Sequence, residues 1–409
     1  MGYGNRIQGN TGIHDDLYVT TLVLDDGNTR AALFTVDHTF IHSKIVEQTK
    51  ALLQDILPDS IFICCSHTHA GPIGYADAQS RPEDQEYINF LVGQLAAIFV
   101  EASSHMQTIN LWAGHSEAHI NINRRERMPD GTIVIGNNPE GLVDHTVQVL
   151  QVRTQQNIPL ATLVNYACHP VVMGPLNRQV SADWVGAMRR GVEANVGGLC
   201  LFVQGATADV NPRKMQWQDD NWDEVEEQGS AVATAVQQAC GSLEVLDTAA
   251  IWARQSTCWL PLMPASGYNS AIQAFLPQAH SDKDIRAALR EIFPWQVDLE
   301  TRHGITYSPV QIGVLRVGDW ALAALGTEPF TETGLAIKAA SQVKMTFVAG
   351  YTNGCNSYLP IASAYKEGGY EVETAPLFYG MPSGFAPGGA EFIVDELKAL
   401  FGDHGSLKR

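Results

Sequence analysis

A pair of histidines separated by one residue is the first feature of the sequence that could do chemistry. His67 and His69 lie in Ser-His-Thr-His-Ala-Gly-Pro, residues 66–72, directly after an apolar run at residues 61–65. In an extended chain, residues i and i+2 point to the same side, so the two imidazoles would share one face. Two imidazoles at a strand end are a common arrangement for zinc, although two hydrogen-bonded histidines would give the same pattern. The pair predicts a metal site and leaves a structural role open.

Two further segments place a potential metal ligand after an apolar run. His169, in Asn-Tyr-Ala-Cys-His-Pro, follows residues 159–167, and ligands gather where strand ends converge. Glu328 follows residues 320–325 in Gly-Thr-Glu-Pro. Its carboxylate could bind a metal or, with Pro329 at a first helical position, could favour a helix N-terminus. Taken alone, each residue has a structural explanation that is the commoner one.

Two loops carry turn-forming, aromatic or small residues. Residues 353–358 read Asn-Gly-Cys-Asn-Ser-Tyr and end at Tyr358, and Tyr370 follows. Aromatic packing explains these tyrosines when the loop is considered by itself. Residues 204–212, Gln-Gly-Ala-Thr-Ala-Asp-Val-Asn-Pro, follow an apolar run, and their small side chains would let the backbone approach a ligand closely. This segment contains no lysine, so a phosphate-binding P-loop is not indicated.

Alternating strand and helix patterns must position these segments. Residues 17–24 and 31–36 predict a hairpin with Asp26 and Gly27 at its turn. Further strands are predicted at residues 61–65, 159–167, 200–203, 320–325 and 345–349, and helices at residues 43–53, 85–102, 183–195, 219–239 and 390–401. This alternation predicts a mixed α/β fold in which mixed sheets are flanked by helices.

The chain length is compatible with one large enzyme domain. We expect residues 1–409 to form a single domain. Residues 259–295 interrupt the alternating pattern, because four prolines surround one helical stretch at residues 282–293. We expect this segment to be an insertion or lid over the site.

Composition restricts the classes of partner. The formal net charge is −18 and the isoelectric point is near 5.0, which disfavours nucleic acid and anionic membranes. The seven cysteines fit no disulfide framework, as in a reduced cytoplasmic protein. No signal peptide follows Met1, and no apolar stretch reaches the roughly 18 residues of a membrane span. We expect a cytoplasmic enzyme for a small molecule, with an unspecified oligomeric state.

The segments together resemble the catalytic domain of the neutral/alkaline non-lysosomal ceramidase family. The family's Thr-His-Thr-His-Ser-Gly-Pro motif is matched by residues 66–72. Its Asn-Tyr-x-x-His-Pro segment, with a following Ser-x-Asp, is matched by residues 165–170 and 181–183. Its Gly-Asp-Val-Ser-Pro-Asn segment is echoed by residues 208–212. Its late Asn-x-Tyr-x-x-Tyr segment, with another tyrosine about twelve residues further on, is echoed by Asn353, Tyr358 and Tyr370. Each motif is moderately specific, and the motifs occur in the same order as in the family over nearly the whole chain.

The resemblance implies a zinc-dependent hydrolase of a C–N bond. The family holds zinc with two histidines, one glutamate and one tyrosine, at the positions of His67, His169, Glu328 and Tyr358. It also implies a catalytic set of substrate-contacting and oxyanion-stabilising residues: His69, Arg124, Tyr358 and Tyr370. Zinc would activate water for attack on the carbonyl. Asp37 and Asp183 are candidate partners of the ligand histidines and could equally be structural carboxylates.

The departures from the family shape the expected substrate. Asn211 stands where the family has Ser, Cys355 replaces the first tyrosine of the late motif, and no C-terminal β-sandwich domain follows before Arg409. With the absence of a secretion signal, these differences lead us to expect a small, polar, soluble amide. A zinc esterase or lactonase, a true ceramidase and a zinc lyase or isomerase are alternative enzymes. A metal-binding protein without catalysis is the alternative of another class.

Overall fold

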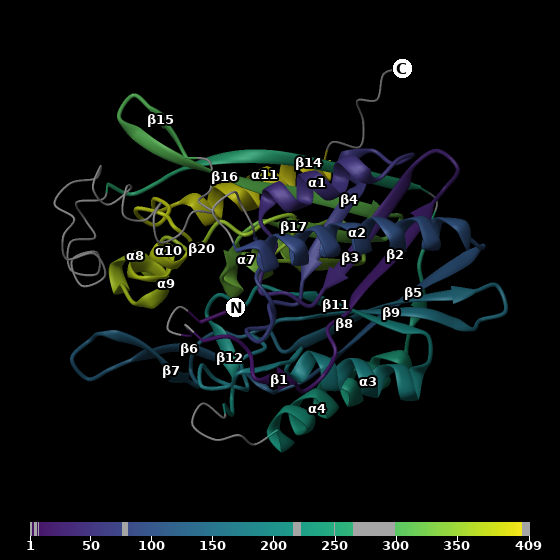
Figure 1. Ribbon diagram of the computed structural model, residues 1–409, viewed down its shortest axis with the longest axis horizontal. Coiled ribbons are helices and arrows are strands. Elements are labelled where there is room, and N and C mark those ends of the chain that lie inside the picture. Colours follow the sequence, from purple (N-terminus) through teal and green to yellow (C-terminus); the bar gives the residue numbers. More distant parts are fainter. Residues whose placement is uncertain are drawn as a thin grey trace.

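Four layers make up the fold in the computed structural model (Figure 1), which describes residues 2–3, 6, 8–75, 81–215, 222–248, 250–264 and 299–402. Two layers of β-sheet lie face to face, and helices cover the outer side of each layer. The predicted mixed α/β class is therefore confirmed.

The first sheet layer is built from two sheets joined by a loop. In one sheet β3 (Arg30–Val36) pairs with β2 (Val19–Asp25) and β4 (Ile61–Cys65). The other has the order β14-β16-β17-β19, and its strands are β14 (Ile251–Pro261), β16 (Ile305–Val317), β17 (Trp320–Leu325) and β19 (Met345–Ala349), with β15 (Glu300–Arg302) paired to β16.

Residues 351–353 form the seam between these two sheets. The backbone N–H of Cys65 donates to the Tyr351 carbonyl at 3.2 Å, and Asn353 N donates to the Ile63 carbonyl at 3.0 Å. On the other side, Thr352 N donates to the Leu325 carbonyl at 3.0 Å. The seam therefore brings the ends of β4 and β17 close together.

The second sheet layer is a single sheet with the order β11-β9-β8-β5-β13. Its strands are β5 (Ile109–Glu117), β8 (Thr146–Thr154), β9 (Pro159–Tyr166), β11 (Leu199–Gln204) and β13 (Glu244–Val245). Strands β9 and β11 are parallel, which requires a crossover connection, and α3 (Trp184–Val196) provides it. Asp183 accepts the Trp184 N–H at the start of this helix, and Gly197 with φ +84° follows its end.

Strand residues alternate between two apolar interfaces. The side chains that fill the space between the sheet layers include Leu33, Phe62, Leu163, Leu201 and Phe347. The outer face of the first layer packs on helices α1 (Ser43–Leu52), α2 (Pro82–Ser104) and α11 (Gly389–Gly402). The outer face of the second layer packs on α3 and α4 (Asp223–Cys240). The strands are buried on both faces, which explains their nearly continuous apolar sequences.

Helix α2 corrects one expectation from the sequence. It is 23 residues long, and its best 18-residue window has a mean hydropathy of 1.2, so by length and composition alone it could cross a membrane. In the structure it contacts α1 and β2. Its buried residues are Ile88, Leu91, Val92, Leu95 and Phe99, all part of the core of the first layer. The helix thus contributes one face to the fold.

Short elements surround the ends of the long strands. A three-stranded sheet contains β6 (Asn121–Arg127), β7 (Ile133–Asn138) and β12 (Val210–Pro212). Two parallel pairs join β1 (Gly12–Ile13) to β10 (Gln179–Val180), and β18 (Glu328–Pro329) to β20 (Tyr358–Leu359). The remaining elements are the 3-10 turn η1 (Pro58–Ser60) and the helices α7 (Thr331–Ala340), α8 (Ala364–Glu367), α9 (Tyr370–Glu373) and α10 (Ala375–Phe378).

One local expectation around these elements is wrong. Pro329 does not begin a helix, because Glu328 and Pro329 form β18 and α7 begins at Thr331. Residues 121–125, which include Arg124, belong to β6 and come after β5. Most of the predicted lid, residues 265–298, lies outside the described residues, and Trp259 belongs to β14.

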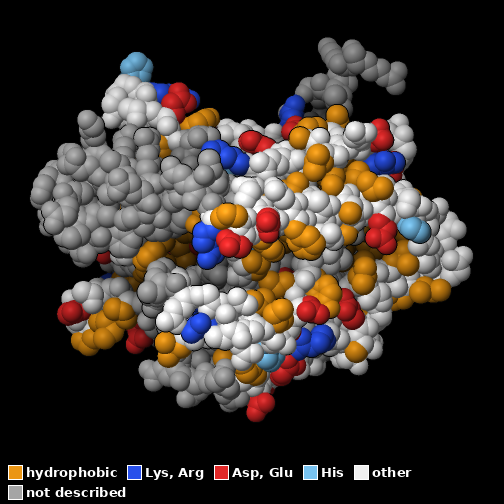
Figure 2. Space-filling view, in the orientation of Figure 1, with side chains coloured by type: hydrophobic (Ala, Val, Ile, Leu, Met, Phe, Trp, Pro, Cys, Tyr) orange, Lys and Arg blue, Asp and Glu red, His pale blue; other side chains and the backbone are white. Residues whose placement is uncertain are grey.

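The face shown in Figure 2 carries charges of both signs. Acidic and basic side chains are interspersed over it, and the described residues on this face form no broad basic patch. The net charge of −18 is therefore not gathered into one acidic surface on this side of the molecule.

Candidate metal and catalytic site

The site forms where strands of both sheet layers end. Strand β4 ends at Cys65, β9 at Tyr166 and β17 at Leu325. His67, His169 and Glu328 follow these ends by two or three residues. All three side chains are 1% exposed. Convergence of strand ends therefore gathers potential ligands that are far apart in the sequence.

Three imidazoles meet at one point. The Nε2 atom of His67 lies 3.2 Å from Nε2 of His169 and 3.1 Å from Nε2 of His69. Glu328 Oε2 lies 3.6 Å from His67 Nε2 and 3.5 Å from His169 Nε2. These distances bring three nitrogens and one carboxylate oxygen into a single cluster, and the histidines form a group that could hold a metal ion.

Backbone carbonyls set which nitrogen of each ligand histidine faces the cluster. His67 Nδ1 donates to the Thr39 carbonyl at 2.6 Å, and His169 Nδ1 donates to the Val210 carbonyl at 2.9 Å. Burial lowers the pKa of His67 to about 3 and also lowers that of His169. Both rings are therefore neutral at pH 7, and their unprotonated Nε2 atoms face each other.

This arrangement of lone pairs fits a bound cation. Two unprotonated nitrogens and a carboxylate oxygen repel one another when nothing positive lies between them. In a tetrahedral zinc site with Zn–N distances of about 2.0–2.1 Å, the nitrogens would be about 3.3 Å apart. The observed separations of 3.2–3.6 Å among His67, His169 and Glu328 bracket that value. The residues present therefore fit zinc.

Two tyrosines that the sequence analysis did not select hold Glu328. Tyr351 donates to Oε2 at 3.1 Å, and the Tyr379 hydroxyl donates to Oε1. Burial alone would raise the pKa of Glu328, but His67, His169 and the Tyr379 hydroxyl lower it to about 2. Tyr351 also stacks on the His67 ring, with centroids 3.9 Å apart. Glu328 is therefore an anion in a fixed orientation.

The backbone at His67 differs from the expected extended segment. Its φ is +67°, a left-handed conformation that is uncommon for a non-glycine residue. His67 and His69 consequently do not share one strand face, although their rings meet as predicted. The His67 N–H donates to the His38 carbonyl at 2.8 Å, which helps to hold this conformation. Strained backbone is often concentrated at functional sites.

Tyr358 and Arg124 form the polar side of the site. Tyr358 pairs with Glu328 in the parallel β18–β20 register. Burial raises the pKa of its hydroxyl well above the usual value, and Glu328 adds to this effect. Arg124 Nη2 donates to the Tyr358 hydroxyl at 3.1 Å, and Nη1 donates to Asn211 Oδ1 at 3.3 Å. Tyr370 packs edge-on against Tyr358, with ring centroids 5.6 Å apart.

A large open cavity reaches this cluster. Its volume is about 1120 Å³, and its lining includes every residue predicted from the sequence for the metal and catalytic sets. The apolar part of its wall includes Phe40, Ile73, Tyr87, Ile135 and Phe378. The cluster therefore has an accessible space beside it in which a substrate could bind.

Comparison with known proteins identifies the relatives of this architecture. The family profile described as neutral/alkaline non-lysosomal ceramidase, N-terminal, matches residues 1–242, more than half of the chain. The chain belongs to the neutral/alkaline non-lysosomal ceramidase family. Neutral ceramidase B of Dictyostelium discoideum is 26% identical over 241 residues, which cover 52% of this chain and 33% of that relative. The chain thus matches about a third of the length of this curated relative.

Solved ceramidase structures share the fold. The neutral ceramidase from Pseudomonas aeruginosa superimposes with a TM-score of 0.71 at 17% identity, covering 96% of this chain and 70% of that one. A ceramidase complexed with C2 gives a TM-score of 0.75 at 17% identity, covering 98% of this chain and 72% of the other. The ceramidase catalytic fold therefore extends beyond the matched residues 1–242.

Two carboxylates proposed as partners of the ligand histidines have other roles in this ceramidase-family site. Asp37 accepts from Arg189 Nη2 at 2.8 Å and from the Tyr18 N–H at 2.9 Å. Asp183 accepts backbone N–H groups, including that of Trp184 at the start of α3. The structural alternative is thus correct for both carboxylates, and the Thr39 and Val210 carbonyls contact the histidines instead.

Proposed function

We propose that the protein is a zinc-dependent hydrolase that cleaves an amide bond. The observation that carries this proposal is the cluster of His67, His169 and Glu328, whose lone pairs and negative charge converge beside an open cavity. A closed cluster without a cavity would have favoured a non-catalytic metal-binding protein. Zinc bound here would lower the pKa of a water ligand to about 7 and polarise a substrate carbonyl.

The proposed ligands are His67, His169, Glu328 and Tyr358, and hydrogen bonding supports a different role for His69. Metal-bound histidines nearly always donate their second nitrogen to a carbonyl or carboxylate. His67 and His169 do so, whereas the buried Nδ1 of His69 has no hydrogen-bond partner among the described residues. Burial lowers the pKa of His69 well below its ordinary value, so the ring is neutral at pH 7. We assign it to proton transfer toward the leaving nitrogen.

Arg124 is the group best placed to stabilise negative charge. Burial alone would lower its pKa, but Tyr358 and Glu371 raise it well above the usual value, so the guanidinium stays charged. Its terminal nitrogens face Tyr358 and Asn211 at the wall of the cavity. The charge would stabilise the oxyanion that develops during attack on the carbonyl. Tyr370 contributes the adjacent aromatic wall.

The substrate we propose is a lipid amide of the ceramide type. This replaces the small, polar, soluble amide expected from the sequence, because the named relatives are ceramidases. The cavity of about 1120 Å³ has aromatic and aliphatic wall residues suited to an acyl chain, and it is slightly larger than the about 300–1,000 Å³ usual for ligand pockets. All seven cysteines are free, which supports the proposed cytoplasmic location.

Metal analysis and a substrate panel test the proposal. We expect about one zinc per chain and turnover of an N-acyl sphingosine in detergent above that of matched esters, lactones and small amides. His67→Ala should lose both zinc and turnover, whereas His119→Ala, which changes an exposed histidine outside the cavity, should lose neither. Faster ester cleavage would reassign the leaving group, and a chain that takes up no metal would refute the proposal.

A further inference from the structure

A buried carboxylate that the proposed mechanism does not use lies behind Arg124. Glu371 is 1% exposed and belongs to α9. Its Oε1 accepts from Arg124 Nε at 2.8 Å, and its Oε2 accepts from Arg125 Nη1 at 2.7 Å. Arg124 and Arg125 are 4% and 7% exposed. One carboxylate therefore bridges two buried guanidinium groups from consecutive residues.

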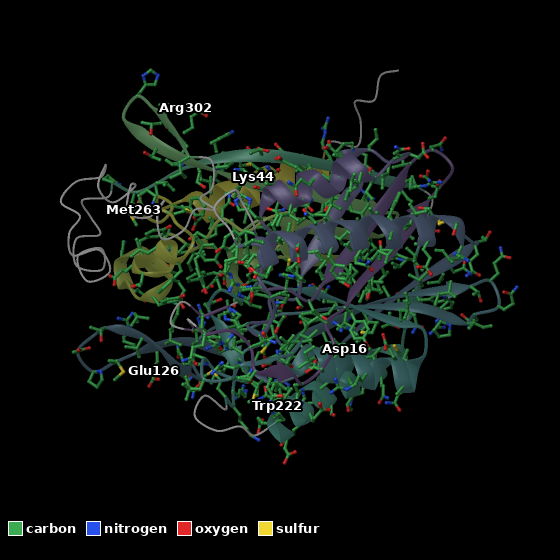
Figure 3. All side chains as sticks on the ribbon, in the orientation of Figure 1. Asp16, Lys44, Glu126, Trp222, Met263 and Arg302 are labelled. Carbon is green, nitrogen blue, oxygen red and sulfur yellow. The ribbon has the colours of Figure 1, made fainter. Side chains whose placement is uncertain are left out.

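An irregularity in β6 makes this bridge possible. Consecutive residues of a regular strand point to opposite faces of the sheet. The β6–β7 register shifts between Asn123 and Arg125, as in a β-bulge, and a bulge changes the direction of neighbouring side chains. Figure 3 labels Glu126, the next residue of β6, on the hairpin that extends below α8 and α9. Both arginines can therefore reach the same helix.

The bridge also fixes the segment that carries Tyr370. Arg125 Nη2 donates to the Gly368 carbonyl at 2.9 Å, and Gly368 and Gly369 have positive φ just before α9. A Cβ at Gly369 would lie 3.0 Å from Ile133 on β7. This close approach and the ion pairs hold α9 against the β6–β7 hairpin. Tyr370, the residue beside Glu371, consequently packs on Tyr358.

The orientation of Arg124 follows from the partner of its Nε atom. A guanidinium is planar, so fixing Nε fixes the directions of both terminal nitrogens. With Nε bound to Glu371, Nη1 and Nη2 point toward Asn211 and Tyr358. Each terminal nitrogen keeps a second N–H. Without the carboxylate, nothing else among the described residues accepts from Nε, and the repulsion between two adjacent buried cations would move the guanidinium.

We infer that Glu371 is a positioning residue, which aims Arg124 at the reacting carbonyl and holds Tyr370 against Tyr358. The inference rests on the proposed function, because it assigns the residue that orients the oxyanion-stabilising group of that reaction. Glu371 is not one of the residues that line the cavity, and it meets the cavity wall through its bond to Arg124.

The test separates orientation from stability by a charge-compensated pair of substitutions. Glu371→Met removes the oxygen that accepts from Arg124 Nε, and alone it leaves two buried guanidinium groups without the carboxylate between them, so this variant could simply unfold. Combining it with Arg125→Met restores the net charge of the buried group, because the wild-type bridge and the double variant both carry one excess positive charge. We expect the thermal midpoint of the double variant to return close to that of Arg125→Met.

The double variant should regain thermal stability but not turnover. Relative to Arg125→Met, we expect kcat of the double variant on an N-acyl sphingosine to fall about 100-fold, as for a misplaced catalytic group, with KM changing much less. Glu373→Met is the matched control, because Glu373 is exposed on the same turn, and it should keep the wild-type kcat. If the stable double variant has the kcat of Arg125→Met, Glu371 is only structural and the inference is wrong.

A binding measurement distinguishes failure of this inference from failure of the proposed function. The dissociation constant for laurate, a carboxylate like the acyl product, can be measured by calorimetry on zinc-loaded protein without any turnover. We expect at least about tenfold weaker binding in the double variant than in Arg125→Met, since the carboxylate would no longer meet an oriented Arg124. If wild-type protein binds laurate but cleaves no amide, the proposed function fails, and unchanged laurate binding in the double variant overturns the role of Glu371.

Discussion

Replacing Tyr379 by Phe removes one hydroxyl from the Glu328 carboxylate and leaves the ring in place. The hydroxyl is a buried donor to Oε1, while Tyr351 donates to Oε2. A hydrogen bond to a charged group contributes about 1.5–3 kcal/mol. Since one pKa unit corresponds to about 1.4 kcal/mol, losing this bond should raise the pKa of Glu328 by about one to two units.

The size of this change in the pKa of Glu328 determines the pH range in which zinc binding is affected. Starting from a pKa of about 2, Glu328 in Tyr379→Phe would still be ionised at pH 7. Zinc affinity at pH 7 should therefore fall by only about 10–100-fold, the usual cost of losing a partner of a metal ligand. As the pH is lowered, protons compete with the metal for the Glu328 carboxylate, so the variant should release zinc at a higher pH than wild-type protein does.

Competition with a chelator over a range of pH measures both the zinc affinity at pH 7 and the pH at which zinc is released. Tyr365→Phe is the matched control, because Tyr365 is a half-buried tyrosine whose hydroxyl donates to the Phe385 carbonyl at 2.8 Å and does not contact Glu328. It should retain wild-type zinc binding. An unchanged zinc affinity and an unchanged pH of release in Tyr379→Phe would show that this hydroxyl does not support a metal ligand, and the reasoning would be refuted.

Three further outcomes follow from the site. His169→Ala should lose zinc as His67→Ala does, because both are linked members of one ligand set, and elemental analysis of each variant checks this. Arg124→Ala should lower kcat by about 100- to 1,000-fold, whereas Arg125→Ala should affect thermal stability more than kcat; steady-state kinetics and thermal denaturation would show whether the two roles are reversed. The pKa of buried His67 is lowered to about 3 from an ordinary 6.5, so the unfolded chain binds its proton first as the pH falls. Metal-free protein should therefore lose stability as the pH drops from about 6.5 toward 3, and denaturant titrations showing equal stability at pH 7 and pH 5 would contradict this.

The sequence identified what depends on apolar patterning. The predicted hairpin, the buried strands β4, β9, β11, β17 and β19 and the helices α1 to α4 and α11 are all present near the expected residues. Each of these segments has a clear hydrophobic pattern or clear helix-boundary residues in the sequence. Strands β5 to β8 and the long β14–β16 pair were not predicted, since their half-buried sequences mix polar and apolar residues.

The site was predictable only in part, because its geometry depends on long-range contacts. The motif around His67 and His69 indicated metal directly, and the cluster brings His169 and Glu328 to it. The left-handed backbone of His67 leaves no clear trace in the sequence. Glu371 lies in the short helix α9 and Tyr379 directly follows α10, and helices of a single turn show no distinguishing period in the sequence. A charged residue directly after Tyr370 was the available signal for Glu371.

The seam formed by residues 351–353 makes the proposed catalytic centre part of the cooperative unit of the fold. Tyr351 contacts His67 and Glu328 through its ring and hydroxyl, and its backbone joins the ends of two sheets. The backbone amides of Thr352 and Asn353 can therefore exchange their hydrogens only when the two sheets separate. Separation of the sheets would also disassemble the site. A ligand bound by the side chains of this seam would therefore slow hydrogen exchange both at these amides and in strands of the two sheets that are distant from the cavity.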